Sequence, residues 1–165
     1  MRLFYALVPD IETRHRIVET QLAIDADGRK VSADKLHMTL VFLGEVDAER
    51  LSLLTGITNR PDLPEIELVL DRIGTYRSAN VLWLGSQEVP LSLIKFRQEL
   101  FDQLTHGGLP SDSRPWQPHV TLYRNLRTRP RTLPTVEIRW RPEDYRLVQS
   151  EITDAGLHYR ILESC

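Results

Sequence analysis

Two short stretches place a histidine and a threonine two residues apart within otherwise apolar surroundings. The first is HMTL at residues 37–40, and the second is HVTL at residues 119–122. The chain has only 5 histidines in 165 residues, so two such matches arise by chance with odds on the order of one in a thousand. The repeated pattern therefore calls for an explanation, whereas a single copy would not.

The spacing predicts which side chains lie together. Along a β-strand, residues i and i+2 lie on the same face, so His37 shares a face with Thr39, and His119 shares a face with Thr121. Imidazole titrates near neutrality, so one ring can accept a proton from water while the other donates a proton to a leaving oxygen. Threonine hydroxyls can donate to the oxygens of an anion. Together these groups suit in-line displacement at phosphorus. They require no metal, and the sequence has no clustered ligand set for one.

The elements that must position these groups are strands with three helices spaced among them. Asp10 is expected to cap a helix that runs to about residue 24, with Ile11, Val18 and Leu22 facing inward. Asp47 is expected to cap the second helix, which holds Leu51 and Leu54. Pro90 is expected in the first turn of a longer helix, which Gly107 and Gly108 end. That helix buries Leu93, Phe96, Leu100 and Leu104. Strands are expected at residues 2–8, 36–44, 66–70, 80–85, 119–123, 136–140, 145–152 and 157–162, with residues 74–80 as a connection.

This order predicts an α+β fold with antiparallel strands. The two motifs lie 82 residues apart, almost half the chain. Two pseudo-symmetric lobes, each presenting one motif strand to a shared groove between two facing sheets, would explain that spacing. At this length, residues 1–165 are expected to form a single bilobed domain with the helices on the outside.

The composition is that of an ordinary globular protein, with 41% hydrophobic and 27% charged residues and a net charge of −2. Such a charge does not favour general binding to long nucleic acid, although it allows a local basic site. The single cysteine, Cys165, provides no disulfide framework and no cysteine metal cluster, which favours a reducing, cytoplasmic location. We expect no targeting segment, no membrane span and no cofactor. A monomer without an obligate protein partner is the default.

The paired motifs, FLGE at residues 42–45 and Pro118 before the second motif resemble the two-histidine phosphoesterases. The most similar branch is the RNA 2′,3′-cyclic phosphodiesterases of bacteria and archaea, historically called 2′-5′ RNA ligases. The resemblance implies a V-shaped central groove and metal-independent hydrolysis of RNA 2′,3′-cyclic phosphate ends to 2′-phosphates. It also implies that His37 is the proton donor to O3′ and His119 the proton acceptor that activates water, with Thr39 and Thr121 holding the phosphate. From the residues alone, either histidine could be the acid.

Phe42 and Arg124 each follow their histidine by five residues. The resemblance implies a base-stacking role for Phe42 and a phosphate-contacting or nucleotide-contacting role for Arg124. Strand alternation places an offset of five on the core face, unless the strand has bulged or ended. Phe42 therefore remains open between stacking and core packing, whereas Arg124 is favoured as functional. Tyr123, on the His119 face by alternation, is a candidate for lining the groove.

Other readings remain open at this point. The arginine-rich run at residues 124–131 is either a basic lip that follows RNA or a solvated loop. The same catalytic groups could join a cyclic-phosphate end to a 5′-hydroxyl, or cleave another cyclic or 2′,5′-linked nucleotide. A module that binds RNA ends without turnover belongs to another class, and retention of both histidines and both threonines argues against it.

Overall fold

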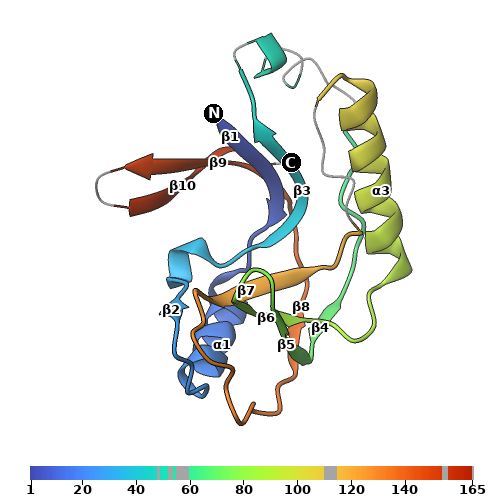
Figure 1. Ribbon diagram of the computed structural model, residues 1–165. Coiled ribbons are helices and arrows are strands. Elements are labelled where there is room, and N and C mark those ends of the chain that lie inside the picture. Colours follow the sequence, from blue (N-terminus) through green and yellow to red (C-terminus); the bar gives the residue numbers. More distant parts are fainter. Residues whose placement is uncertain (48, 52–53, 55–59, 110–114, 154–155, 165) are drawn as a thin grey trace.

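The computed structural model describes residues 1–47, 49–51, 54, 60–109, 115–153 and 156–164. The strands follow one another in runs between the helical elements (Figure 1). The Asp47 carboxylate accepts from the Arg50 backbone amide at 2.9 Å, as expected of a helix cap, and residues 49–51 are helical. The helical elements are α1 (Ile11–Leu22), the 3-10 turn η1 (Ala33–Lys35) and α3 (Leu91–His106). The strands are β1 (Arg2–Leu7), β2 (Arg29–Lys30), β3 (Met38–Glu45), β4 (Leu68–Leu70), β5 (Arg72–Tyr76), β6 (Val81–Gly85), β7 (His119–Arg124), β8 (Ile138–Trp140), β9 (Arg146–Thr153) and β10 (Gly156–Ser164).

Eight of these strands form one sheet in the order β10-β9-β1-β3-β7-β6-β5, and β2 pairs with β7 beside this path. Strands β4 and β8 form a separate two-stranded sheet. Every strand pairing in the described residues is antiparallel. The α+β class and the antiparallel pairing expected from the sequence are thus confirmed.

The two motif strands are neighbours in that sheet. Strands β3 and β7 are joined by one residue pair, Met38 with Val120. This junction separates a group formed by β10, β9, β1 and β3 from a group formed by β7, β6 and β5, which lie above and below each other in Figure 1. One residue pair thus joins the two groups into a single sheet, and the two facing lobes expected from the sequence remain a prediction.

Helix α1 begins as expected but buries a different face. The Asp10 carboxylate accepts from the Thr13 backbone amide and hydroxyl, both at 2.8 Å, which satisfies an amide that the first turn leaves free. The buried residues are Thr13, Ile17 and Gln21. Ile11 and Leu22, expected inward, are 72% and 68% exposed. The inward placement of Ile11 and Leu22 was therefore wrong, whereas Val18 packs against the core as expected. Gln21 is buried instead, because its side-chain amide donates to the carbonyls of Leu122 and Val31.

Helix α3 confirms its expected limits and core stripe. Pro90 occupies the N-cap and Gly107 the C-cap, and the buried side chains are Leu93, Phe96, Leu100 and Leu104. These side chains belong to one core cluster with Met38, Leu40, Val120 and Leu122, which are the apolar residues of both motifs. The expected α+β scaffold thus holds the apolar face of each motif strand in the core.

The connection expected at residues 74–80 is partly strand. Strand β5 extends to Tyr76 and pairs with β6, and Asn80, at a positive φ of 50°, lies in the turn. Gly74 is required here, since a Cβ at this position would overlap the Trp83 indole. No helix among the described residues is long and apolar enough to cross a bilayer.

Candidate active site

Strand β3 carries a β-bulge inside the first motif. Thr39 pairs with Ala6 of β1, whereas Val41 pairs with Tyr5, so Leu40 is the extra residue. Leu40 and Val41 are both buried, although they are consecutive. The bulge reverses the alternation of side chains for the residues that follow it, up to a second irregularity between Phe42 and Gly44.

Strand β7 carries the equivalent bulge inside the second motif. Thr121 pairs with Trp83 of β6, whereas Tyr123 pairs with Leu82, so Leu122 is the extra residue. Leu122 and Tyr123 are again consecutive buried residues. Both strands therefore reverse their alternation three residues after the motif histidine.

The two bulges determine which later residues lie on the motif face, the face of the sheet that carries the histidines and threonines of both motifs. Phe42 is half-buried and packs with the cluster of Phe4 and Tyr159, and Arg124 lines the same pocket as Thr121. Tyr123 is turned to the core instead, where it is 7% exposed and its hydroxyl donates to the Gln21 carbonyl at 2.8 Å. Its expected place on the His119 face was wrong, because alternation was counted through a bulge.

A helix side chain holds each bulge from the core side. Gln21 of α1 donates through Nε2 to the carbonyl of Leu122 at 2.9 Å and to that of Val31 at 3.0 Å. Arg97 of α3 donates through Nε to the carbonyl of Leu40 at 3.2 Å. The Leu122 carbonyl also accepts from the Val31 backbone amide at 2.9 Å, so Gln21 supplies a second donor to it. Both side chains thus tie a bulge to a helix.

The histidines and threonines of both motifs lie around the single β3–β7 pair. Met38 and Val120, which form that pair, are each fully buried at 0% exposure. The histidine and threonine that flank each of them are half-buried. Since adjacent residues of a strand face opposite sides, all four polar side chains lie on the face opposite the core. One face of one sheet thus presents two imidazoles and two hydroxyls.

The backbone fixes the tautomer of each imidazole. His37 Nδ1 lies 2.8 Å from the Lys35 carbonyl oxygen, and His119 Nδ1 lies 2.8 Å from that of Gln117. A carbonyl can only accept, so Nδ1 carries the proton in both rings. Nε2 of each neutral ring then has a free lone pair. Both imidazoles are therefore held in the form that can accept a proton at Nε2.

Aromatic rings surround His37. Phe4 of β1 lies 4.9 Å from it between ring centroids. Tyr159 of β10 lies 5.1 Å away and meets the imidazole edge-on at 88°. Neither residue was predicted for the site, because both come from strands distant in sequence and neither carries a motif.

His119 has a similar setting built from other strands. Tyr76 of β5 meets its ring edge-on, at 5.1 Å and 77°, and the Trp83 ring lies 6.2 Å away. The Tyr76 hydroxyl lies 3.4 Å from Nδ1, which already donates to a carbonyl, so this contact packs the ring without fixing its proton. Sequence reasoning missed Tyr76 because it treated this segment as a connection.

The surroundings of both imidazoles disfavour their charged form. Burial lowers the pKa of His37 from 6.5 to about 4, the Lys35 carbonyl opposes this, and the positive charges of Arg124 and His119 add to it. Burial also lowers the pKa of His119, with Arg124 contributing. That His37 responds to the charge of His119 indicates that the two rings interact. Without a bound anion, both rings are neutral at pH 7.

A pocket of about 140 Å³ opens beside His37. It brings together His37, Thr121, Arg124 and Tyr159, and it extends to β2, η1 and the start of β10. Thr39 and His119 are not among its lining residues. Both residues are neighbours of the Met38–Val120 pair that joins β3 to β7, so they lie next to the pocket on the same face of the sheet.

Trp116 links the segment before β7 to the first motif. Its indole Nε1 donates to the Thr39 carbonyl at 2.9 Å. The bond crosses the junction between β3 and β7, so it helps to hold the two motifs together.

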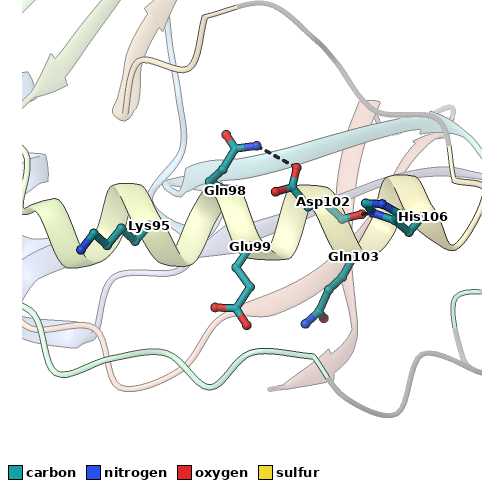
Figure 2. Close-up of a pocket in the computed structure, with 6 residues that line it drawn as sticks. All are labelled: Lys95, Gln98, Glu99, Asp102, Gln103 and His106. Carbon is teal, nitrogen blue, oxygen red and sulfur yellow. Dashed lines mark hydrogen bonds between the residues drawn. The ribbon is translucent and has the colours of Figure 1, made fainter.

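A hollow of about 440 Å³ lies along α3 and is lined by no motif residue. Figure 2 shows the six α3 residues that line it, with Gln98 Nε2 donating to Asp102 Oδ1 at 2.8 Å. Within the described ranges, no group of three or more His, Cys, Asp or Glu residues is arranged to hold a metal ion.

The chain matches the model of the 2′-5′ RNA ligase superfamily over residues 9–151. It is 39% identical over 127 residues to the RNA 2′,3′-cyclic phosphodiesterase of Escherichia coli, covering 75% of this chain and 72% of that protein. It is 30% identical over 175 residues to the Thermus thermophilus protein of the same name, covering 99% of this chain and 88% of that protein. The apo structure of E. coli LigT superposes with a TM-score of 0.88 at 31% identity, over 99% of this chain and 95% of that chain. LigT has also been solved with 3′-AMP and with phosphate.

Proposed function

Because the chain belongs to the 2′-5′ RNA ligase superfamily, we propose that it hydrolyses 2′,3′-cyclic phosphate ends of RNA to 2′-phosphates without a metal. The observation that carries the proposal is the placement of two His-x-Thr motifs on neighbouring strands, with all four polar side chains on one face. The relatives named RNA 2′,3′-cyclic phosphodiesterase support the same substrate class.

The reaction assigns one step to each imidazole. His119 accepts a proton from water at Nε2, and the water oxygen forms a bond to phosphorus. The bond from phosphorus to O3′ breaks, and O3′ takes a proton from Nε2 of His37. The products are a 2′-phosphate and a free 3′-hydroxyl, and proton exchange with solvent resets both rings. Each such proton transfer contributes ~10²–10⁴ in rate.

The remaining motif-face residues hold the substrate. Thr39 and Thr121 donate to the non-bridging phosphate oxygens, where negative charge develops. Arg124, which lines the pocket beside Thr121, provides a charge-assisted contact to a phosphate group of the bound nucleotide. Phe42, exposed on this face by its bulge, provides a surface for the terminal base.

His37 can donate only when it is protonated. With a pKa of about 4 in the free protein, its ring is neutral at pH 7. A bound cyclic phosphate adds a negative charge beside the ring, which raises that pKa. Substrate binding thus supplies the acid form in the complex where it is needed.

Ligation is the second candidate, since the superfamily name refers to it. The groups that open the cyclic phosphate also catalyse attack by a 5′-hydroxyl, because an acid in one direction is a base in the other. Water at its ordinary concentration favours hydrolysis. Cleavage of another cyclic or 2′,5′-linked nucleotide and RNA-end binding without turnover are the other outcomes that the assay separates.

The test is incubation of the protein with adenosine 2′,3′-cyclic phosphate in excess chelator. We expect the 2′-phosphate as product, resolved from the 3′-phosphate by chromatography. His37→Ala and His119→Ala should each lower kcat by about 10² or more while the far-UV circular dichroism is unchanged. His158→Ala, which alters a histidine of β10 outside both motifs, is the matched control. A need for added metal, a purely 3′-phosphate product or near-normal turnover by either variant would contradict the proposal.

A further inference from the structure

Two arginines lie opposite each other where β2 pairs with β7, the strand of the second motif. Arg29 of β2 lies directly opposite Arg124 of β7 in the strand register. Directly opposed residues of an antiparallel pair have Cβ atoms only ~5 Å apart, and like charges in this position destabilise a sheet. In the described part of the chain, neither arginine takes part in an ion pair. An anion held between them would remove this repulsion.

The pocket that contains this pair is strongly positive. Its cationic residues are Arg29, Lys30, Lys35 and Arg124, and none of the described residues that line it is acidic. Lys35 has an acidic neighbour, Asp34. The pKa of Asp34 is lowered by a hydrogen bond from the Ser32 side chain and, to a smaller extent, by the positive charge of Lys35. Among the described residues, Arg29, Lys30 and Arg124 take part in no ion pair, and of these only the two arginines lie directly opposite each other.

Tyr159 lies at the same place and supplies a neutral donor. Its hydroxyl is near Arg124, Arg2 and Arg29, whose charges lower its pKa, while burial, the larger effect, raises it above the usual value. The phenol therefore remains protonated at neutral pH and can donate a hydrogen bond to an anion.

The pocket is small for a nucleoside. Sites for whole small-molecule ligands usually enclose ~300–1,000 Å³, whereas this pocket has about 140 Å³. Its size and charge suit one phosphate group. It also adjoins His37 and Thr121, so the phosphate it holds is close to the reacting one.

An RNA that ends in a 2′,3′-cyclic phosphate has only one phosphate next to the reacting group along the strand, on the 5′ oxygen of the terminal nucleotide. We infer that the Arg29–Arg124 pair binds this 5′ phosphate, an inference that rests on the proposed function. The preferred substrate is then a terminal nucleotide that carries a 5′ phosphate group, as an oligonucleotide end does, and not a bare cyclic nucleoside phosphate.

The inference is tested with three substrates assayed in chelator at one salt concentration. Adenosine 2′,3′-cyclic phosphate has no 5′ phosphate, the same compound with a 5′-monophosphate has a free one, and the dinucleotide ApA with a cyclic end has a phosphodiester. We expect kcat/KM to be about tenfold or more higher for the two substrates with a 5′ phosphate group. Equal values for all three would overturn the inference. A response to the monophosphate alone would also overturn it, because the subsite would then serve nucleotides and not RNA.

Arg29→Ala locates the subsite. We expect the ratio of kcat/KM for the dinucleotide to that for the mononucleotide to fall by about tenfold, and Arg29→Lys to keep most of the ratio. Arg160→Ala removes the same charge from an exposed position of β10 and should keep the ratio. Arg129 lines a second hollow with Tyr76 and Arg127. If Arg129→Ala lowers the ratio and Arg29→Ala does not, the subsite lies there and the inference is wrong.

The same data separate the two proposals. If the unaltered protein hydrolyses none of the three substrates, the proposed function fails. If it hydrolyses all three and the ratio is unaffected by Arg29→Ala, the function stands and the second phosphate subsite does not.

Discussion

Each motif imidazole has two fixed contacts, one with a backbone carbonyl and one with a tyrosine ring. A carbonyl two residues earlier binds Nδ1 at 2.8 Å, and a tyrosine from another strand meets the ring edge-on at 5.1 Å. The carbonyl sets the tautomer, and the tyrosine limits rotation of the ring. The two rings therefore present Nε2 in equivalent settings, although their neighbours come from different strands.

The lowered pKa values of the two histidines predict the direction in which kcat/KM changes with pH. In the free protein at pH 7, His119 is neutral and ready to accept a proton, whereas His37 has lost the proton that it must donate. Since kcat/KM follows the free protein, we expect it to rise as pH falls from about 8 to about 6. The alkaline limb of kcat should lie at higher pH, because bound phosphate restores the proton of His37. A kcat/KM that is constant across this range would contradict these roles. Initial-rate measurements in constant-ionic-strength buffers provide both profiles.

At the scale of elements, the paired bulges decide the composition of the site. Leu40 and Leu122 occupy the same place in their motifs. By reversing alternation there, each strand keeps its histidine and threonine on one face and adds the residue five positions after the histidine. Without the bulges, Phe42 and Arg124 would face the core.

Gln21 is expected to maintain the second bulge. Gln21→Met keeps the shape of the side chain but removes both hydrogen bonds of Nε2, to Leu122 and Val31. The Leu122 carbonyl keeps its bond from the Val31 amide, and each lost hydrogen bond contributes about 0.5–1.5 kcal/mol. We therefore expect a loss of about 1–3 kcal/mol in the free energy of unfolding by urea for the two bonds together. We also expect a raised KM, because Arg124 follows the bulge. Gln98→Met on α3, which loses only the bond to Asp102, should change stability by less than about 0.5 kcal/mol. If the two variants are equally stable and have the same KM, Gln21 does not maintain the bulge.

The sequence predicted the site as far as the bulge and no further. The shared face of His37 and Thr39 followed from strand alternation alone, and so did the core stripe of α3 from its periodicity. The place of Tyr123 could not be predicted, because the bulge before it depends on β6 and on Gln21, both distant in sequence. Tyr76 and Tyr159 were missed for a similar reason, since sheet pairing alone brings their strands near the motifs.

At the scale of the whole molecule, charge is concentrated where an anion would bind. The net charge is −2, yet four cationic residues line one pocket of about 140 Å³. Local fields of this kind attract anionic ligands even when the molecule as a whole is acidic. The single pair between β3 and β7, together with the Trp116 bond to Thr39, brings the two halves of the chain to that place.

The measurement that most directly tests whether two imidazoles act on one phosphate is a pH titration of the histidine ring resonances, with and without adenosine 2′-phosphate, the proposed product. Histidine variants assign the five signals. We expect the pKa of both His37 and His119 to rise when the ligand is bound, His37 from about 4. A rise for only one of the two motif histidines, or for neither, would contradict a shared phosphate site.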